Sequence, residues 1–140
     1  MLQETCHDWE ACIDRGAAPL LTCGAILPSY PEAIKRSHRE MGPYMVIAPG
    51  IMLAHARPEA GAKAVGLTIL TLREPIAFGS EHNDPVRLVI TLATPDDKSH
   101  VEMLEALSEF LMTEGLAEQL MTAECMESAE ALFGKKKRSA

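Results

Sequence analysis

The sequence predicts an α/β protein in which a single β-sheet carries helices on both faces. Helical periodicity dominates both ends of the chain, three apolar segments in the middle are rich in strand-forming residues, and turn residues separate them. The resulting α-β-β-β-α order is typical of a layered domain. A length of 140 residues suits one domain, and neither an internal repeat nor a long linker divides it.

The N-terminal third is predicted to be helical. Apolar residues recur at roughly helical spacing between Thr5 and Cys23, although Gly16 and Pro19 should divide this segment into one helix and a second, short one. The next helix is predicted over residues 29–41, with the first serine as its cap and a proline in its first turn. The Gly-Pro pair that follows should end it.

The middle of the chain supplies the predicted strands. Residues 44–47, 64–72 and 86–92 are short apolar runs bounded by turn residues, which favours buried strands over helices. Between the first two strands, residues 51–61 are predicted to form a loop or short strand, and this segment holds His55.

The C-terminal part returns to helical spacing. Ser99 and Glu102 match a capping box, so we expect a helix to begin there with His100 as its first internal residue. Two further helices are predicted near residues 116–121 and 128–133.

The charge distribution indicates an acidic body with a basic end. The formal net charge is −7, although the last residues include Lys135, Lys136, Lys137 and Arg138. An acidic body argues against nucleic-acid binding, and a short cationic terminus is typically a solvated end. We therefore expect a domain over residues 1–134 and a basic tail over residues 135–140.

Cysteine usage and hydropathy predict a cytoplasmic protein. The four cysteines form no C-x-x-C pair and have no histidine at zinc-finger spacing, so reduced, mostly buried thiols are expected and no metal site is implied. An N-terminal signal is missing, as is any run of about 18 apolar residues, so no direct membrane insertion is expected.

His55 is the strongest candidate for chemistry among the five histidines. It lies in LAHARPEAG, a turn segment that also contains Arg57 and Glu59. A neutral imidazole attacks phosphorus well when its second ring nitrogen is held as a donor, and a guanidinium stabilises charge on phosphoryl oxygens. We therefore interpret His55 as a candidate nucleophile and Arg57 as a candidate hydrogen-bond donor that stabilises the charge of the phosphoryl group.

His100 is a second candidate because the start of a helix offers free N–H groups and a positive dipole end to a phosphate. The residue pattern alone leaves open that His55 and His100 are ordinary surface or hydrogen-bonded residues. His7, His38 and His82 are interpreted as polar surface residues, with the alternative that the turn GSEHNDP brings His82 to the active face.

The segment GPYMVIAPGIMLAHARPEAGAKAVGLTILTLREPIAFGSEHNDPVRLVITLAT, followed by SHVEMLEALSEFL, resembles the mannitol–fructose class of phosphotransferase-system IIA domains. Within that class the chain is most similar to the ascorbate-type branch. The resemblance implies a three-layer sandwich whose central mixed, mostly parallel sheet of about five strands is flanked by helices on both faces.

The resemblance also implies roles for particular residues. His55 takes the place of the histidine that accepts a phosphoryl group from the phosphocarrier protein HPr, and His100 that of the second active-site histidine. Arg39 falls where mannitol-type members have an arginine that supports the active site, and Arg57 lies in the HARPE segment of the branch. One departure is Ala54, since family members usually have proline directly before the active histidine.

The implied function is a phosphoryl carrier without cofactor or metal. His55 would pass its group to a cysteine of a IIB component that works with a membrane IIC permease for ascorbate or a related sugar. The alternative is a regulatory IIA-type module whose histidine phosphorylation state controls a partner protein. Partner docking is expected on apolar residues around His55, with Ile51, Met52 and Leu53 as candidates.

Overall fold

The structure is a computed structural model that describes residues 4–112. Its elements are, in chain order, α1 (Trp9–Thr22), α2 (Ser29–Met41), β1 (Val46–Ala48), β2 (Ile51–Ala54), the 3-10 helix η1 (Pro58–Ala60), β3 (Gly66–Ile76), β4 (Val86–Ala93) and α3 (Asp97–Met112). The helices predicted near residues 116–121 and 128–133 and the basic tail lie outside the described residues. Within residues 4–112, no helix is both long and apolar enough to cross a membrane.

The sheet has the strand order β1-β2-β4-β3 and is mixed. The predicted α/β class with helices on both faces is confirmed, but the part of the chain described contains four strands instead of about five. The mostly parallel arrangement is wrong in detail, because only β2 and β4 run parallel. The two other strand pairs, β1 with β2 and β3 with β4, are antiparallel. Their connections, residues 49–50 and 77–85, are too short for the crossover that parallel neighbours require.

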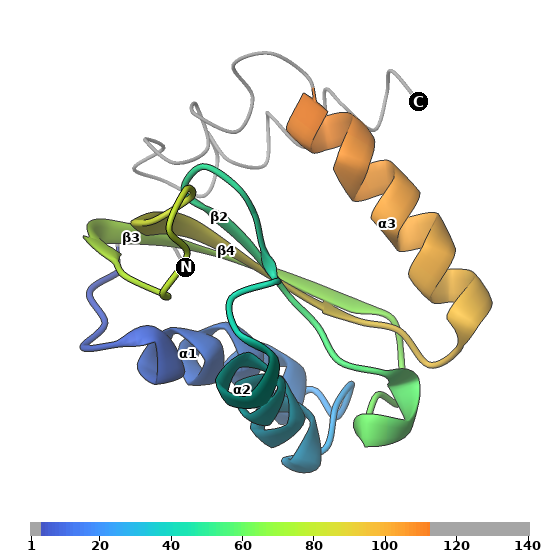
Figure 1. Ribbon diagram of the computed structural model, residues 1–140. Helices are drawn as coiled ribbons and strands as arrows, with labels where there is room; N and C mark the ends of the chain where they lie inside the picture. Colours follow the sequence, from blue (N-terminus) through green and yellow to red (C-terminus); the bar gives the residue numbers. More distant parts are fainter. Residues whose placement is uncertain (1–3, 113–140) are drawn as a thin grey trace.

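Two apolar clusters lie on opposite faces of the sheet. Figure 1 shows α1 and α2 on one face and α3 on the other. Strand β4 serves both clusters, with Leu88, Ile90 and Leu92 packed toward α3 and with Val89 and Ala93 packed on the side of α1 and α2. Burial on both faces explains why this strand reads as a continuous apolar run. Packing on both faces also holds the C-terminal end of β4 in place, next to the cleft described below.

Helix α1 is continuous, so the predicted break into two helices is wrong. Gly16 and Pro19 both lie inside it, and the buried stripe that includes Ile13 and Leu20 continues past them. At Gly16 the helix comes so close to β4 that an added Cβ atom would lie 2.6 Å from Oγ1 of Thr91. The glycine is therefore a packing requirement of the helix and sheet, and Pro19 removes one N–H only in the last turn.

The two other helix starts also differ from the predictions. Pro28 precedes α2 in the cap position, and the Ser29 hydroxyl instead donates to the carbonyl oxygen of Ala60 at 2.6 Å. Helix α3 begins at Asp97, because an Asp96 carboxylate oxygen accepts the Ser99 N–H at 2.7 Å. The capping box is thus replaced by an aspartate cap. The predicted end of α2 at Met41 is confirmed.

The cysteines of residues 4–112 are all free thiols. Cys12 is buried, Cys6 is half-buried and Cys23 is exposed, so the expectation of mostly buried thiols does not hold for these three. Cys125 lies outside the described residues.

Candidate active site

The parallel pairing of β2 with β4 brings His55 and His100 together. His55 directly follows the last residue of β2, and His100 lies in the first turn of α3, which follows β4. Since the carboxyl ends of parallel neighbours meet at one edge of a sheet, the two segments converge there. The imidazole ring centroids are 5.5 Å apart, with 40° between the ring planes. Two histidines far apart in the sequence therefore share one site.

A cleft of about 420 Å³ opens at this edge. Its walls come from α2, from the segment after β2 and from the start of α3, and they include His55, Arg57, Asp97 and His100. Tyr44 stands beside His55 with its ring edge-on, at a centroid distance of 6.4 Å. The cleft thus combines two imidazoles, one guanidinium and an aromatic wall.

The hydrogen bond made by His55 fixes which ring nitrogen is reactive. Nδ1 lies 3.0 Å from the carbonyl oxygen of Leu53. A carbonyl oxygen can only accept, so Nδ1 carries the proton and donates it. In the neutral ring, Nε2 then keeps its lone pair and is the nucleophilic or basic atom. Ala54 is buried and paired in register with Thr91, so the sheet itself holds the residue before His55.

Burial lowers the pKa of His55 below the ordinary histidine value. The hydrogen bond to Leu53 raises the pKa and offsets this effect in part, and the nearby His100 lowers it again by a smaller amount. His55 is accordingly neutral near pH 7, the form in which an imidazole acts as a nucleophile.

His100 is oriented by a residue that the sequence did not single out. Its Nδ1 atom lies 3.3 Å from Oγ1 of Thr94, which is buried. When the hydroxyl donates to Nδ1, the neutral His100 ring carries its proton on Nε2 and can donate into the cleft. The helix end is less open than predicted, because Asp96 already caps it and Asp97 adds a second carboxylate. In that tautomer, the His100 ring offers an N–H donor at this end of the cleft.

Arg57 lies in the cleft wall and has an exposed side chain. The four ion pairs formed within residues 4–112 do not include it. Its backbone precedes η1, and its carbonyl oxygen accepts the Ala60 N–H at 2.9 Å. An anion bound beside His55 is thus within the region that this guanidinium can sample. Glu59 is exposed and lines a neighbouring hollow with Asp96.

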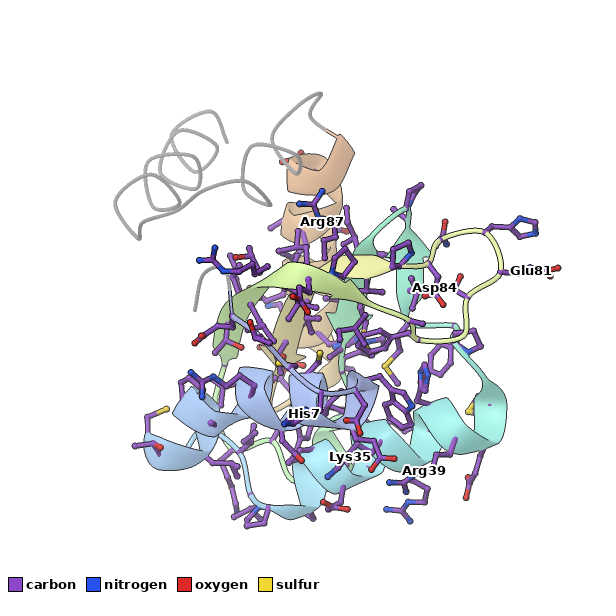
Figure 2. The ribbon with its side chains drawn as sticks, turned by 90° about the vertical axis from the view of Figure 1, so that its left-hand side faces the viewer. His7, Lys35, Arg39, Glu81, Asp84 and Arg87 are labelled. Atoms are coloured by element: carbon purple, nitrogen blue, oxygen red, sulfur yellow. The ribbon has the colours of Figure 1, made fainter. Side chains whose placement is uncertain are left out.

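The structure does not bring Arg39 into the cleft. Arg39 pairs with Glu10 at 3.2 Å, and its guanidinium carbon lies 5.8 Å from the centroid of the Trp9 ring. Figure 2 shows Arg39 on the side of α2 that faces away from the sheet. The α2 residues in the cleft wall include Ser37 and Met41, on another face of that helix. A surface contact between α1 and α2 accounts for Arg39.

Of the remaining histidines, His38 is buried, so its interpretation as a surface residue is wrong. Its Nε2 atom lies 2.8 Å from the carbonyl oxygen of Phe78, and its ring packs at a tilt against Trp9, with 4.3 Å between the ring centroids. His7 and His82 are exposed, as predicted. His82 lies in the loop between β3 and β4, at the end of the sheet opposite to His55.

Figure 2 shows that loop projecting from the sheet, with Glu81 and Asp84 labelled on it. The alternative that this turn reaches the active face is therefore wrong, because antiparallel pairing of β3 and β4 places their connection at the other end.

The predicted docking residues Ile51, Met52 and Leu53 are also misplaced, because all three are buried in β2. The large apolar side chains that line the cleft and are exposed are instead those of Met41 and Tyr44.

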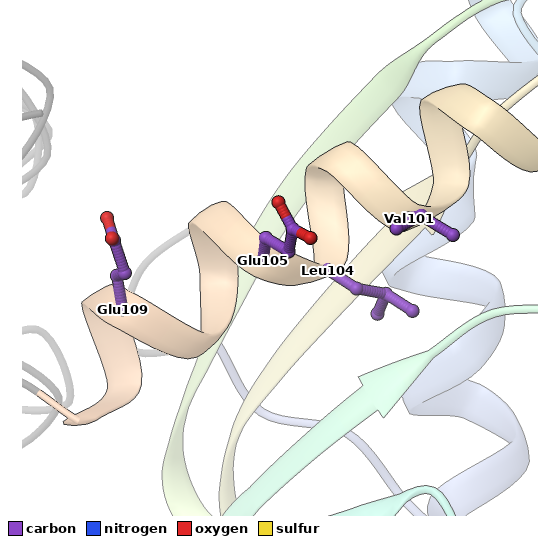
Figure 3. A pocket seen from close by; sticks show the side chains of 4 residues that line it. All are labelled: Val101, Leu104, Glu105 and Glu109. Carbon is purple, nitrogen blue, oxygen red and sulfur yellow. The ribbon is translucent and has the colours of Figure 1, made fainter.

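A second hollow of about 430 Å³ runs along α3. Val101, Leu104, Glu105 and Glu109 line it, and Figure 3 shows all four side chains on that one helix. These residues include neither a nucleophile nor a cation. The cleft around His55 is therefore the candidate active site.

Comparisons with known proteins identify relatives of the whole domain. The family model described as "Phosphoenolpyruvate-dependent sugar phosphotransferase system, EIIA 2" matches residues 1–135. The mannitol-specific cryptic phosphotransferase enzyme IIA component of Escherichia coli (strain K12) is 40% identical over 116 residues, which cover 83% of this chain and 78% of the relative. The ascorbate-specific PTS system EIIA component of Salmonella typhi is 38% identical over 102 residues, covering 73% and 66%, respectively.

Solved structures share the fold. The solution structure of the mannitol-specific cryptic IIA enzyme from Escherichia coli has a TM-score of 0.88 at 35% identity, over 96% of this chain and 90% of that one. The IIA chain in the complex of enzyme IIA and phosphorylated enzyme IIB of the Escherichia coli mannitol system has a TM-score of 0.84 at 22% identity, over 96% and 93%.

Proposed function

Because the chain belongs to the EIIA 2 family of the phosphoenolpyruvate-dependent sugar phosphotransferase system, we propose that its phosphoryl group is carried on Nε2 of His55. The observation that carries this assignment is the hydrogen bond from Nδ1 to the carbonyl oxygen of Leu53 at 3.0 Å. It leaves Nε2 as the nucleophilic atom of a ring that burial keeps neutral. We assign the carrier domain to residues 1–134 and treat residues 135–140 as a tail.

The proposed donor is a phosphohistidine of the carrier protein HPr. The lone pair of His55 Nε2 forms the new P–N bond while the P–N bond of the donor breaks, and the donor imidazole keeps that electron pair. Each ring retains the proton on its other nitrogen, so no base is needed. Such a transfer depends mainly on position and on stabilisation of the equatorial oxygens.

His100 and Arg57 are proposed to stabilise those oxygens. The ring centroids of His100 and His55 are 5.5 Å apart, so a phosphoryl oxygen on a phosphorylated His55 lies within reach of a donor on the neighbouring His100 ring. Arg57 adds a full positive charge from the wall of the cleft. Both groups act without a metal ion.

The proposed acceptor is a cysteine of a IIB component, whose thiolate forms a P–S bond as the P–N bond of His55 breaks. The mannitol IIA protein of the same fold is described in a complex with phosphorylated IIB. A membrane IIC permease would use the phosphorylated IIB, and the ascorbate-specific relative favours ascorbate or a related sugar. These partners place the chain in the cytoplasm.

Partner docking is assigned to the exposed apolar side chains beside the cleft. Met41 is 69% exposed and Tyr44 47%, and both line the cleft. An apolar rim of this kind suits a partner that must bring its own phosphorylated residue against His55 and exclude water there.

The proposal is tested by incubating the protein with phosphoenolpyruvate, enzyme I and HPr and measuring the intact mass. We expect one acid-labile phosphate on the wild-type protein and none on His55→Gln. His82→Gln is the matched control, because His82 is exposed at the opposite end of the sheet, and it should be labelled as the wild type is. Normal labelling of His55→Gln would overturn the assignment.

A further inference from the structure

We propose that Tyr30 is a positioning residue whose hydroxyl holds the His55 segment against the end of β4 and thereby sets the His55–His100 geometry. The inference deepens the proposed function and rests on it. Tyr30 belongs to the first turn of α2 and is only 1% exposed. It does not line the cleft, so its hydroxyl acts through backbone groups and not on a substrate.

The Tyr30 hydroxyl joins two segments at once. Its oxygen accepts the Ala56 N–H at 3.0 Å, and it lies 2.7 Å from the carbonyl oxygen of Leu92, to which it donates. The carbonyl oxygen of Ala56, at 3.1 Å, is a longer alternative acceptor. Burial raises the pKa of Tyr30, so the hydroxyl keeps the proton that it donates.

One partner is adjacent to His55, and the other lies close in the chain to the residue that contacts His100. Ala56 follows His55 directly, and Leu92 lies two residues before Thr94, which is in contact with His100. The hydroxyl oxygen of Tyr30 therefore connects the segment after β2, which carries His55, to the end of β4, which leads to His100. Three elements, α2, β2 and β4, meet at this point.

The segment between β2 and η1, which carries His55, depends on this hydrogen bond for its position. The strand ends at Ala54, and the next regular element, η1, begins only at Pro58. In that interval the Ala56 N–H has the Tyr30 hydroxyl as its acceptor. Phosphoryl transfer is sensitive to such an anchor, since a misplacement of about 1 Å can lower the rate about a hundredfold.

The test uses Tyr30→Phe in the full chain, with Thr68→Val as the matched control. The Thr68 hydroxyl also donates a hydrogen bond to a backbone oxygen, that of Gly16 in α1, at 2.5 Å. Neither residue lines the cleft. Single-turnover uptake of phosphate from phosphorylated HPr at saturating donor should fall at least about tenfold in Tyr30→Phe. Thr68→Val should stay within about twofold of the wild type.

Nuclear magnetic resonance of the imidazole nitrogens reports on the environment of His55 directly. Its signals should not change if Tyr30 contributes only to the overall stability of the fold. In folded Tyr30→Phe we expect the His55 Nδ1–H signal to weaken and its titration midpoint to rise toward the ordinary value of about 6.5, because the segment loosens and becomes hydrated. In the wild type, the Ala56 amide should be protected from hydrogen exchange, a measurement that does not depend on the folding of any variant.

The outcomes separate the two claims. Wild-type uptake with wild-type imidazole signals in Tyr30→Phe would overturn the positioning role, and so would equal rate losses in both variants or an unprotected Ala56 amide. If the wild type takes up no phosphate on His55, the proposed function fails. In that case the imidazole and exchange measurements still decide whether Tyr30 holds the segment.

Discussion

At the scale of single residues, the two histidines of the cleft are prepared in different ways. His55 is half-buried and donates to a backbone carbonyl, so the strand that precedes it determines which ring nitrogen has a free lone pair. His100 has its Nδ1 atom against the hydroxyl of Thr94 and lines the cleft. In the proposed mechanism, the nucleophilic His55 and the stabilising His100 therefore carry their protons on different ring nitrogens.

This difference predicts the effect of His100→Gln. Glutamine keeps an N–H donor but loses the imidazole, so His55 should still be labelled while onward transfer to IIB slows by about tenfold. Rapid-quench transfer from the labelled protein measures the rate, and His82→Gln is the control. Onward transfer at the wild-type rate in His100→Gln would contradict the stabilising role.

The residues that the sequence could identify are those whose evidence is local. His55 stands out because Arg57 and turn residues surround it in one short segment. Tyr30, Thr94 and the burial of His38 could not be recognised, because their roles depend on partners that are distant in sequence or have no motif. Tyr30 contacts Ala56 and Leu92, and His38 contacts Phe78.

At the scale of elements, the close approach of α1 to β4 predicts the effect of Gly16→Ala. Alanine favours an isolated helix by about 1 kcal/mol, but here its Cβ would lie 2.6 Å from Oγ1 of Thr91, a stiff β-branched side chain. We expect a net loss of about 1–3 kcal/mol in the free energy of unfolding, measured by urea denaturation.

A second substitution tests the cause. In Gly16→Ala combined with Thr91→Ala, the clashing oxygen is gone, so the double variant should lose less than the sum of the two single losses. If the two losses simply add, steric contact between these residues is not the reason for the glycine.

Element predictions succeeded where burial and sequence pattern agree. The strand over residues 86–92 and the end of α2 at Met41 were predicted because apolar runs and a Gly-Pro pair are unambiguous. Helix α1 was divided wrongly, since local propensity at Gly16 and Pro19 is outweighed by the buried stripe that packs on the sheet. The start of α3 was misplaced because two residues, Asp96 and Ser99, both suit a cap.

At the scale of the whole molecule, the buried His38 and the half-buried His55 link stability to pH. Burial lowers the pKa of both His38 and His55, and the interactions of His38 with Phe78 and Asp84 offset this only in part. Below about pH 6.5 the unfolded chain takes up protons that the folded protein does not accept until lower pH. The free energy of unfolding should therefore fall as the pH drops from 6.5 toward the folded-state values.

His38→Gln isolates one part of this dependence. Glutamine can still donate to the carbonyl oxygen of Phe78 but does not titrate, so the variant should lose less stability between pH 7 and pH 5 than the wild type does. Urea denaturation at several pH values measures the difference. Parallel curves for the two proteins would show that His38 contributes nothing to the acid sensitivity.

The parallel pairing of β2 with β4 also has a consequence for how the molecule folds. It joins residues 51–54 to residues 88–91, a long-range contact that forms only after the chain has closed a large loop containing η1 and β3. Until that closure, His55 has neither Leu92 nor His100 near it. On the proposed function, phosphate uptake on His55 would therefore report completed topology, and a chain with its helices formed but without this pairing would not carry the group.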